Sequence, residues 1–389
     1  MSKSEKKPLF VHTYSFLAGN TAKAGAIGTR AAQGATAQQQ QRPAVAVDQE
    51  WRRWVAENVL LRQEPLSIIE AMVRAGVDRA TAIGEVHAAI DHPYIRAARQ
   101  SHTAAADAAK NVDARIQKRD WVLECYRRTA RQATTHGKVP RMPKLSRQTF
   151  LDNYYALNRP VVMTGAMDDW PAMTRWTAKE LKSRFGDRVV SVQANRDNDA
   201  NYEVNSAKLR SEMTFGEFVD ITETISETNN YYITANNSET NRETLKDLWK
   251  DIIPFPEYLR DDDPANRGFF WFGPKGTVTP LHHDLTNNFM AQVRGRKLVR
   301  LVAPYELQNL YNNRHCYSAV NLDNIDYAQF QLFRNVTVID VEIGPGDLLF
   351  LPVGWWHYVR GLETSITMTF TNFVFDNDFH SVYKTYQEI

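Results

Sequence analysis

Cysteine is nearly absent from this chain, which has only Cys125 and Cys316 in 389 residues. Two cysteines cannot build a disulfide framework, and such scarcity is typical of a reducing compartment. Long hydrophobic runs are also missing, because no apolar stretch approaches the roughly 18 residues that a membrane helix needs. The N-terminus lacks the apolar core of a secretion signal. We therefore expect a cytoplasmic protein without a membrane span.

Neither sign of charge is in excess. Lysine and arginine number 47 against 45 aspartates and glutamates, which leaves a net charge of +2. Composition therefore gives no reason to expect a nucleic-acid or membrane partner. Hydrophobic residues are plentiful, at 43%, so the chain can form one large domain or two modest ones.

The sequence divides into four parts by composition and periodicity. Asp48 and Asp78 sit where caps would begin helices, and apolar residues recur at helical spacing after each. Further on, Trp121, Leu123 and Tyr126 are expected to rest on the domain that follows. The predicted parts are a disordered basic, glutamine-rich tail (1–47), a small helical bundle (48–92), a long helical connector (93–137) and a catalytic domain (138–389) with its barrel core at about 230–375.

One stretch combines metal-binding side chains with strand periodicity. In TPLHHDLTNNFMAQV, which begins at Thr279, polar and apolar residues alternate, so residues two apart share a face. His282 and Asp284 then point the same way. His283 points to the opposite face, where its partner two residues on would be Leu285. A histidine and a carboxylate at that spacing are two of the three ligands in the triad that holds non-haem Fe(II).

A candidate third ligand lies in GPGDLLFLPVGWWHYV. A turn, a short apolar strand and a second turn lead to His357, which follows Asp284 by 73 residues. Alone, a histidine beside two tryptophans is more often packed in a core. Because both motifs occur in order, they predict one iron site built from His282, Asp284 and His357.

With these motifs, the run from Gly273 to Phe373 resembles the cupin-like JmjC family of Fe(II)- and 2-oxoglutarate-dependent oxygenases. It is most similar to the asparaginyl hydroxylases of that family that act on hypoxia-inducible factor, and the resemblance extends loosely back to about Pro140. We expect an α+β fold, in which a double-stranded β-helix, the jelly-roll barrel of cupins, follows an α-helical N-terminal region. The resemblance implies Fe(II), 2-oxoglutarate and O₂ as cofactors.

The resemblance also implies how 2-oxoglutarate is held. Lys297 matches the family's lysine that anchors the carboxylate farther from the metal. Thr279 and Tyr232 match hydroxyl donors to the same carboxylate. Tyr231 adjoins Tyr232, and one register slip would exchange them.

Two further positions complete the implied pocket. Asn288 matches an asparagine that lines the metal site. The family pattern has an asparagine near Thr369, where this chain has threonine, and Asn372 is three residues on and faces the other way. One polar contact to the cosubstrate therefore departs from the pattern.

By this resemblance, the protein hydroxylates a C–H bond of a protein or peptide side chain and releases succinate and CO₂. Three alternatives stay open: a hydroxylase of a free amino acid or small natural product, an N-methyl-lysine demethylase, and a non-catalytic cupin scaffold. The long helical region before the barrel favours a protein or peptide partner. A homodimer, if formed, is expected to use a surface other than C-terminal helices.

Two expectations concern the surroundings of the site. The irregular connection from Tyr305 to about Asn335 would act as a substrate lid. Nearby aromatic residues would exclude water from the iron, namely Phe270, Trp271, Phe289, Trp355 and Trp356.

Overall fold

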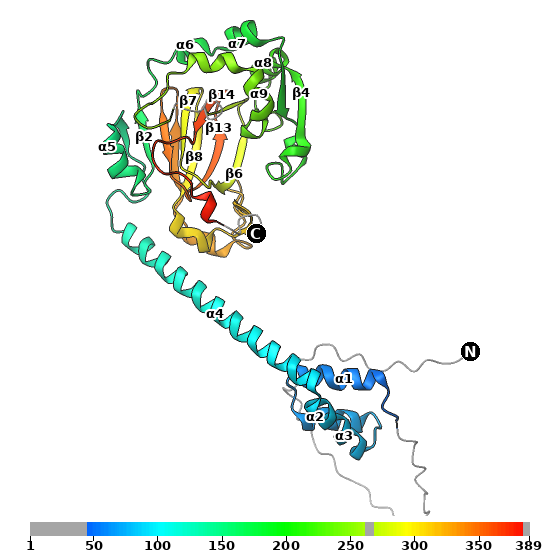
Figure 1. Ribbon diagram of the computed structural model, residues 1–389. Coiled ribbons are helices and arrows are strands. Elements are labelled where there is room, and N and C mark those ends of the chain that lie inside the picture. Colours follow the sequence, from blue (N-terminus) through cyan, green and yellow to red (C-terminus); the bar gives the residue numbers. More distant parts are fainter. Residues whose placement is uncertain (1–44, 261–267, 384–389) are drawn as a thin grey trace, which may run out of the picture. The chain divides into compact units, whose positions relative to one another are not determined.

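The computed structural model describes residues 45–260 and 268–383 (Figure 1). The predicted tail, residues 1–47, lies almost entirely outside them. The chain forms two compact units, Met1–Ala108 and Ala109–Ile389. In the described part, no helix combines the length and apolar character needed to cross a membrane.

The first unit is a bundle of three helices, α1 (Gln49–Leu60), α2 (Pro65–Arg74) and α3 (Arg79–Asp91). Asp48 caps α1 by accepting the Trp51 amide at 2.9 Å, and Asp78 caps α3 by accepting the Thr81 amide at 2.9 Å. The bundle buries an apolar core of its own, formed by Val55, Val59, Ile68, Ile69, Met72, Val77, Ala82 and Val86.

Helix α4 (Pro93–Ala130) is a single helix of 38 residues whose C-terminal part belongs to the second unit. Next to its end, the Arg131 guanidinium donates to the carbonyl of Asn335 at 2.9 Å. The expectation that Trp121, Leu123 and Tyr126 rest on the following domain is wrong for Trp121 and Tyr126, because their exposed fractions are 58% and 62%. Leu123 is half-buried. Polar contacts near the end of α4, such as the hydrogen bond of Arg131, attach the helix to the rest of the second unit instead.

The second unit contains two six-stranded sheets that form the barrel (Figure 1). In spatial order, the first comprises β1 (Arg141–Pro143), β2 (Val161–Thr164), β12 (Leu348–Leu351), β7 (Asn288–Arg294), β14 (Ser365–Phe370) and β5 (Phe269–Gly273). The second comprises β11 (Ile339–Ile343), β8 (Lys297–Val302), β13 (Trp356–Gly361), β6 (Val278–His283), β10 (Tyr317–Ser318) and β9 (Asn312–Arg314). A separate antiparallel pair joins β3 (Val189–Gln193) to β4 (Arg210–Thr214). The α+β jelly-roll prediction is confirmed.

Short helices precede and cover the first sheet. They are α5 (Arg147–Phe150), which continues into a π-helical turn (Leu151–Tyr155), α6 (Ala172–Arg175), α7 (Ala178–Phe185), α8 (Phe215–Thr224) and α9 (Ser238–Thr244). Thr214 and Glu217 form a full capping box at the start of α8. Thr177 caps α7, but the Glu180 side chain bonds Arg175 rather than completing a second box.

Alternation along the strands separates an inner core from two outer ones. Between the sheets, Met290, Val299, Leu301 and Leu349 belong to one apolar cluster. On the outer face of the first sheet, a larger cluster joins the strands to the short helices. On the outer face of the second, Leu281 and others pack under the connection that follows β8. The functional side chains described below share the inner face with the first of these clusters.

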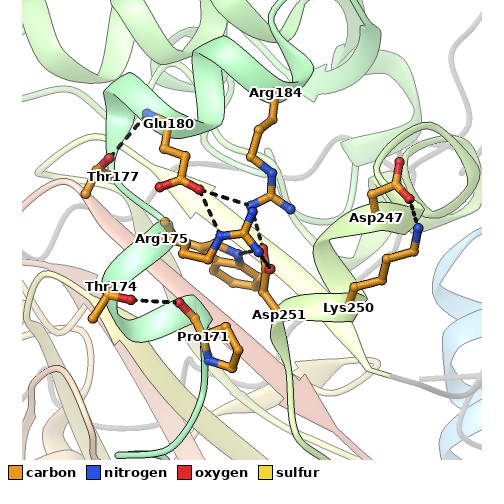
Figure 2. Close-up of polar contacts among 10 residues, drawn as sticks. Pro171, Thr174, Arg175, Thr177, Glu180, Arg184, Asp247, Lys250 and Asp251 are labelled. Atoms are coloured by element: carbon orange, nitrogen blue, oxygen red, sulfur yellow. Dashed lines mark hydrogen bonds and ion pairs between the residues drawn. The ribbon is translucent and has the colours of Figure 1, made fainter.

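A buried carboxylate ties two of the short helices to the chain beyond them (Figure 2). Asp251 is fully buried and accepts from the guanidinium groups of Arg175 at 2.6 Å and Arg184 at 2.5 Å, and from the Trp176 indole at 3.0 Å. Glu180 accepts a further bond from Arg175 at 2.9 Å. Because three of these bonds converge on one buried charge, this network fixes how α6 and α7 meet the segment that ends at Asp251.

Candidate metal centre and cosubstrate pocket

Three metal-ligating side chains converge on the inner face of the second sheet. His282 on β6 lies directly opposite His357 on β13, and Asp284 follows β6. Nε2 of His282 is 3.8 Å from one Asp284 carboxylate oxygen, and Nε2 of His357 is 4.0 Å from the other. One ligand atom from each of the three lies within 4.8 Å of the others.

These distances suit a single divalent ion. An octahedral ion with bonds of about 2.1 Å holds neighbouring ligand atoms roughly 3 Å apart, so each donor needs to move by less than about 1 Å. Two imidazoles and one carboxylate on one side of an ion are the donor set of non-haem iron, and the opposite side stays free for other ligands. The residues present therefore fit the metal that the sequence predicts.

Hydrogen bonds orient each candidate ligand. Nδ1 of His282 is 2.8 Å from the carbonyl of Pro280, and Nδ1 of His357 is 3.2 Å from that of Trp355. A carbonyl can only accept, so Nδ1 carries the proton in both rings and Nε2 keeps its lone pair for a metal. The Asn288 amide donates to Asp284 at 3.1 Å.

The protonation states also suit metal binding. Burial lowers the pKa of His357 to about 3, with a further contribution from His282, so its imidazole is neutral. Burial opposes ionisation of Asp284, but His357 and His282 outweigh this effect and lower its pKa. A neutral imidazole and an ionised carboxylate are the forms that bind a cation. His283 lies on the other face, 4.8 Å from the Trp356 ring centroid.

A β-bulge brings Thr279 to the face of the metal ligands. Thr279 pairs with Val359, and His282 pairs with His357. Two β6 residues, Pro280 and Leu281, therefore stand opposite a single residue of β13. Simple alternation would put Thr279 and His282 on opposite faces, because they are three residues apart. The extra residue restores a common face.

Lys297 lies deep in the same barrel. It pairs with Gly361, two places along β13 from Val359, and so shares the inner face. The lysine is 1% exposed, and its Nζ donates to the hydroxyl of Tyr232 at 3.1 Å. No carboxylate of the described residues pairs with it, and burial lowers its pKa to about 7. A buried ammonium in this state is suited to receive an anion.

The remaining predicted residues lie around this pocket. Tyr232 is 2% exposed and turned inward, whereas Tyr231 packs against the outer core. The Thr369 hydroxyl accepts from the Trp271 indole at 3.0 Å, and the Trp271 ring lies 5.8 Å from that of Tyr232. Threonine therefore forms a polar contact with an indole where the family pattern has asparagine.

Two expectations about the surroundings need correction. The connection after β8 is not an irregular lid, because it includes β9, β10 and two 3₁₀ segments (Pro304–Asn309, Gln331–Asn335), and its apolar residues cover the outer face. Within the connection, Tyr317 is paired with the candidate ligand His282, and the two rings stack with centroids 5.7 Å apart.

The aromatic residues do not surround the metal centre as expected. Phe270 and Phe289 belong to the outer core of the first sheet, and Trp356 belongs to that of the second. Trp355 belongs to the apolar cluster between the sheets, and its indole donates to Asn158. Of the five aromatic residues, Trp271 and Trp355 therefore face the interior, because the other three alternate outward.

Sequence reasoning missed a polar group beside Tyr232. It comprises Gln193 at the end of β3, and Arg196 and Glu203 in the loop that follows. Its members belong to no motif. The one available signal is that a β-rich segment, VVSVQ, ends in a polar residue.

A family model described as the Cupin-like domain matches residues 146–381. Lysine-specific demethylase 8 of Xenopus tropicalis is 33% identical over 245 residues, which are 60% of this chain and 52% of that protein. Lysine-specific demethylase JMJ30 of Arabidopsis thaliana is 33% identical over 245 residues, 61% of this chain and 56% of the relative. The chain thus spans about half the length of both.

A relative with a different name matches the same share of the chain. The tRNA wybutosine-synthesizing protein 5 of Homo sapiens is 27% identical over 247 residues, 60% of this chain and 77% of its own length. The predicted closer similarity to asparaginyl hydroxylases stays a prediction.

Proposed function

The chain belongs to the cupin-like JmjC family, and from that premise we propose that it is an Fe(II)- and 2-oxoglutarate-dependent oxygenase that oxidises a C–H bond in a protein side chain. The observation that carries the proposal is the common inner face of His282, Asp284, His357 and Lys297. A scaffold has no need of a buried unpaired ammonium beside a complete metal triad, because leaving a charge unpaired in the core costs stability.

The proposed role of each residue follows from its position. His282, Asp284 and His357 hold the metal, and Asn288 orients the carboxylate by donating to it. Lys297, with the hydroxyls of Tyr232 and Thr279, binds the far carboxylate of 2-oxoglutarate, which thereby reaches the metal from a fixed direction. When bound, iron with 2-oxoglutarate and O₂ supplies the oxidising equivalent, and succinate and CO₂ leave.

N-methyl-lysine in a protein is the substrate to test first, because relatives at 33% identity are named lysine-specific demethylases. Oxidation of the N-methyl C–H bond adds a hydroxyl to that carbon. The C–N bond then breaks, the hydroxyl proton passes to the nitrogen, and the carbon leaves as formaldehyde. The net change in the substrate is the loss of one methylene unit.

Stable hydroxylation of a side chain is the second candidate. It uses the same residues, but the reaction stops at the hydroxylated product. No C–N cleavage follows when the hydroxylated carbon does not bear nitrogen. The relative named for wybutosine synthesis in tRNA also means that the net charge of +2 is no ground for excluding an RNA substrate. A free amino acid or natural product remains the small-molecule alternative.

One experiment separates these outcomes. Protein loaded with Fe(II) and 2-oxoglutarate is incubated with peptides that carry N-methyl-lysine and with matched unmethylated peptides. Demethylation gives formaldehyde and a mass loss of about 14 Da, whereas hydroxylation gives a gain of about 16 Da without formaldehyde.

Two variants serve as controls. Asp284→Ala removes a metal ligand and is expected to abolish succinate formation. His283→Gln alters the neighbouring histidine on the outer face, so it should retain metal binding and 2-oxoglutarate turnover. Absence of succinate from the wild-type protein under all conditions would refute the oxygenase proposal.

A further inference from the structure

A groove lies between α1 and α2 on the surface of the helical bundle. Its cavity has a volume of about 640 Å³. Trp51 and Trp54 line it from α1 as a T-shaped pair with ring centroids 5.4 Å apart, and Ile68 and Ala71 line it from α2. Both tryptophans stay partly exposed beside the apolar core of the bundle. Apolar surface left open beside a completed core marks a place where another polypeptide binds.

The groove has the layout of a peptide-binding surface. Its other lining residues include Glu50, Gln63, Ser67 and Arg74, which are all polar and exposed. An apolar centre with a polar, exposed rim is the usual arrangement of a protein interface. A groove between two helices can accept the apolar face of a third helix.

The chain that precedes the described residues arrives at one end of this groove. Ala75 lines the groove, and the carbonyl of the next residue, Gly76, accepts from the backbone N–H of Val45 at 2.9 Å. The Val45 side chain also lies against Gly76, because a Cβ added there would be 3.1 Å from it. Residues 1–44, which lie outside the described part of the chain, are therefore tethered beside the groove.

Apolar and aromatic residues of this preceding chain gather in one short segment, PLFVHTYSFL, residues 8–17. Residues 18–44 contain no aromatic residue. Phe10, Tyr14 and Leu17 recur at positions i, i+4 and i+7, which is the spacing of side chains that share one helix face and anchor a helix in a groove. Pro8 is suited to the first turn of such a helix.

Reach and charge both favour this segment as the occupant. The 27 residues between Leu17 and Val45 can span up to about 90 Å, whereas α1, with 12 residues, is about 18 Å long. Residues 1–44 carry six basic residues and one acidic residue, and residues 45–92 carry eight acidic and five basic ones. The two parts therefore have opposite net charges, which favours their association.

We propose that residues 8–17 bind in the groove of their own bundle, with Phe10, Tyr14 and Leu17 directed at the two tryptophans. The bound segment covers the indole rings and closes the groove to other peptides. A peptide partner of the bundle then has to displace it against a local concentration on the order of 1 mM, because the segment is tethered. This contact is independent of the oxygenase reaction, so either proposal can fail without the other.

A fluorescein-labelled peptide of residues 3–17 tests whether the groove is already occupied. The wild-type full chain should bind it weakly in fluorescence anisotropy, because the tethered segment excludes it. The triple variant Phe10→Ser, Tyr14→Ser, Leu17→Ser leaves the groove open and should bind the peptide at least tenfold more tightly. Equal affinities of the two proteins, or absence of binding to the triple variant, would overturn the proposal.

Matched controls test the helix face and the position of the site. Val11→Ser with Phe16→Ser alters two side chains on other helix faces, so this full chain should bind the peptide as weakly as wild type. Within the triple variant, Ala71→Lys places an ammonium among apolar groove residues and should weaken binding at least tenfold. Ala80→Lys adds the same charge at an exposed position of α3 outside the groove and should leave it unchanged. Equal effects of the two lysines would place the peptide elsewhere and refute the assignment.

Two measurements on the full chain need no groove substitution. Amide hydrogens of α1 and α2 should exchange more slowly in wild type than in the triple variant, with α3, which does not line the groove, as the reference. Identical exchange in the two proteins would contradict a bound segment. Sedimentation velocity should give both proteins the same state of association. A wild-type dimer that the triple variant loses would assign the groove to the segment of a second copy and overturn binding within one chain.

Discussion

Lys297→Met is expected to weaken the binding of 2-oxoglutarate and to stabilise the ligand-free protein. Methionine keeps the length and the apolar stem of the side chain but removes the ammonium. The loss of one charge-assisted hydrogen bond costs about 2 kcal/mol, which corresponds to a dissociation constant about 30-fold higher. The hydroxyl of Tyr232 remains but cannot replace the charge.

The stabilising effect follows from the proton equilibrium of the buried lysine. Its pKa falls from 10.5 to about 7 on folding. At roughly 1.36 kcal/mol per pKa unit, folding with the ammonium buried costs up to about 5 kcal/mol below pH 7. Between about pH 7 and 10.5 only the unfolded chain keeps the proton, so the cost shrinks as pH rises and the wild-type protein gains stability. Methionine does not titrate, so Lys297→Met lacks this dependence of stability on pH.

Urea unfolding and calorimetry test the two effects separately. At pH 6 the free energy of unfolding should be higher for Lys297→Met than for wild type. This advantage should shrink by up to about 3 kcal/mol between pH 6 and pH 9. Calorimetry with Mn(II) should show wild-type affinity for 2-oxoglutarate decreasing above pH 7, by at most about tenfold per pH unit, because binding requires the charged lysine. The variant should lack this decrease.

The reasoning would be refuted by an unchanged affinity for 2-oxoglutarate in the variant. The anchoring role would then pass to another cation, with Arg300 the next to test. A variant that is less stable than wild type at pH 6 would contradict the cost assigned to the buried ammonium. Lys297→Arg is a useful comparison, because it keeps a charge that cannot be lost at these pH values.

The metal site, the buried ion network and the helical bundle give three further predictions. Asp284→Ala with His357→Ala should abolish binding of Fe(II) or Mn(II) by equilibrium dialysis, and full occupancy would disprove the assignment. Asp251→Asn should lower the unfolding free energy by about 2 kcal/mol, less than for a fully buried pair because its arginine partners are partly exposed; an unchanged urea midpoint would contradict this. Deletion of residues 1–92 should leave 2-oxoglutarate turnover intact, because the bundle has its own core, while protein hydroxylation falls about tenfold if the bundle binds substrate; full efficiency would reject that role.

The metal triad was predictable because its information is local. His282 and Asp284 share a strand face by simple alternation, and His357 follows a turn that ends one strand and begins the next. Helix starts at Asp48 and Asp78 were predictable for the same reason, since a cap depends on residues within one turn.

Other features depend on contacts that the sequence does not display. Simple alternation puts Thr279 on the wrong face, because it takes no account of the β-bulge at Pro280. The bulge is defined by how β6 pairs with β13, and the sequence of β6 alone does not reveal that pairing. Gln193 and Tyr232 are 39 positions apart, and their pairing arises from a bridge between segments that carry no shared motif. The aromatic residues were misplaced because composition says that they are buried but not on which side of a sheet.

The direct pairing of His282 with His357 has a mechanical consequence. An ion bound to both rings is a cross-link between two neighbouring strands, added to their backbone hydrogen bonds. Bound iron would therefore stiffen the seam between β6 and β13, and local opening there would require release of the metal. We expect amide hydrogens along this seam to exchange more slowly in iron-loaded protein, in which case iron supply would set the rigidity of the barrel as well as its chemistry.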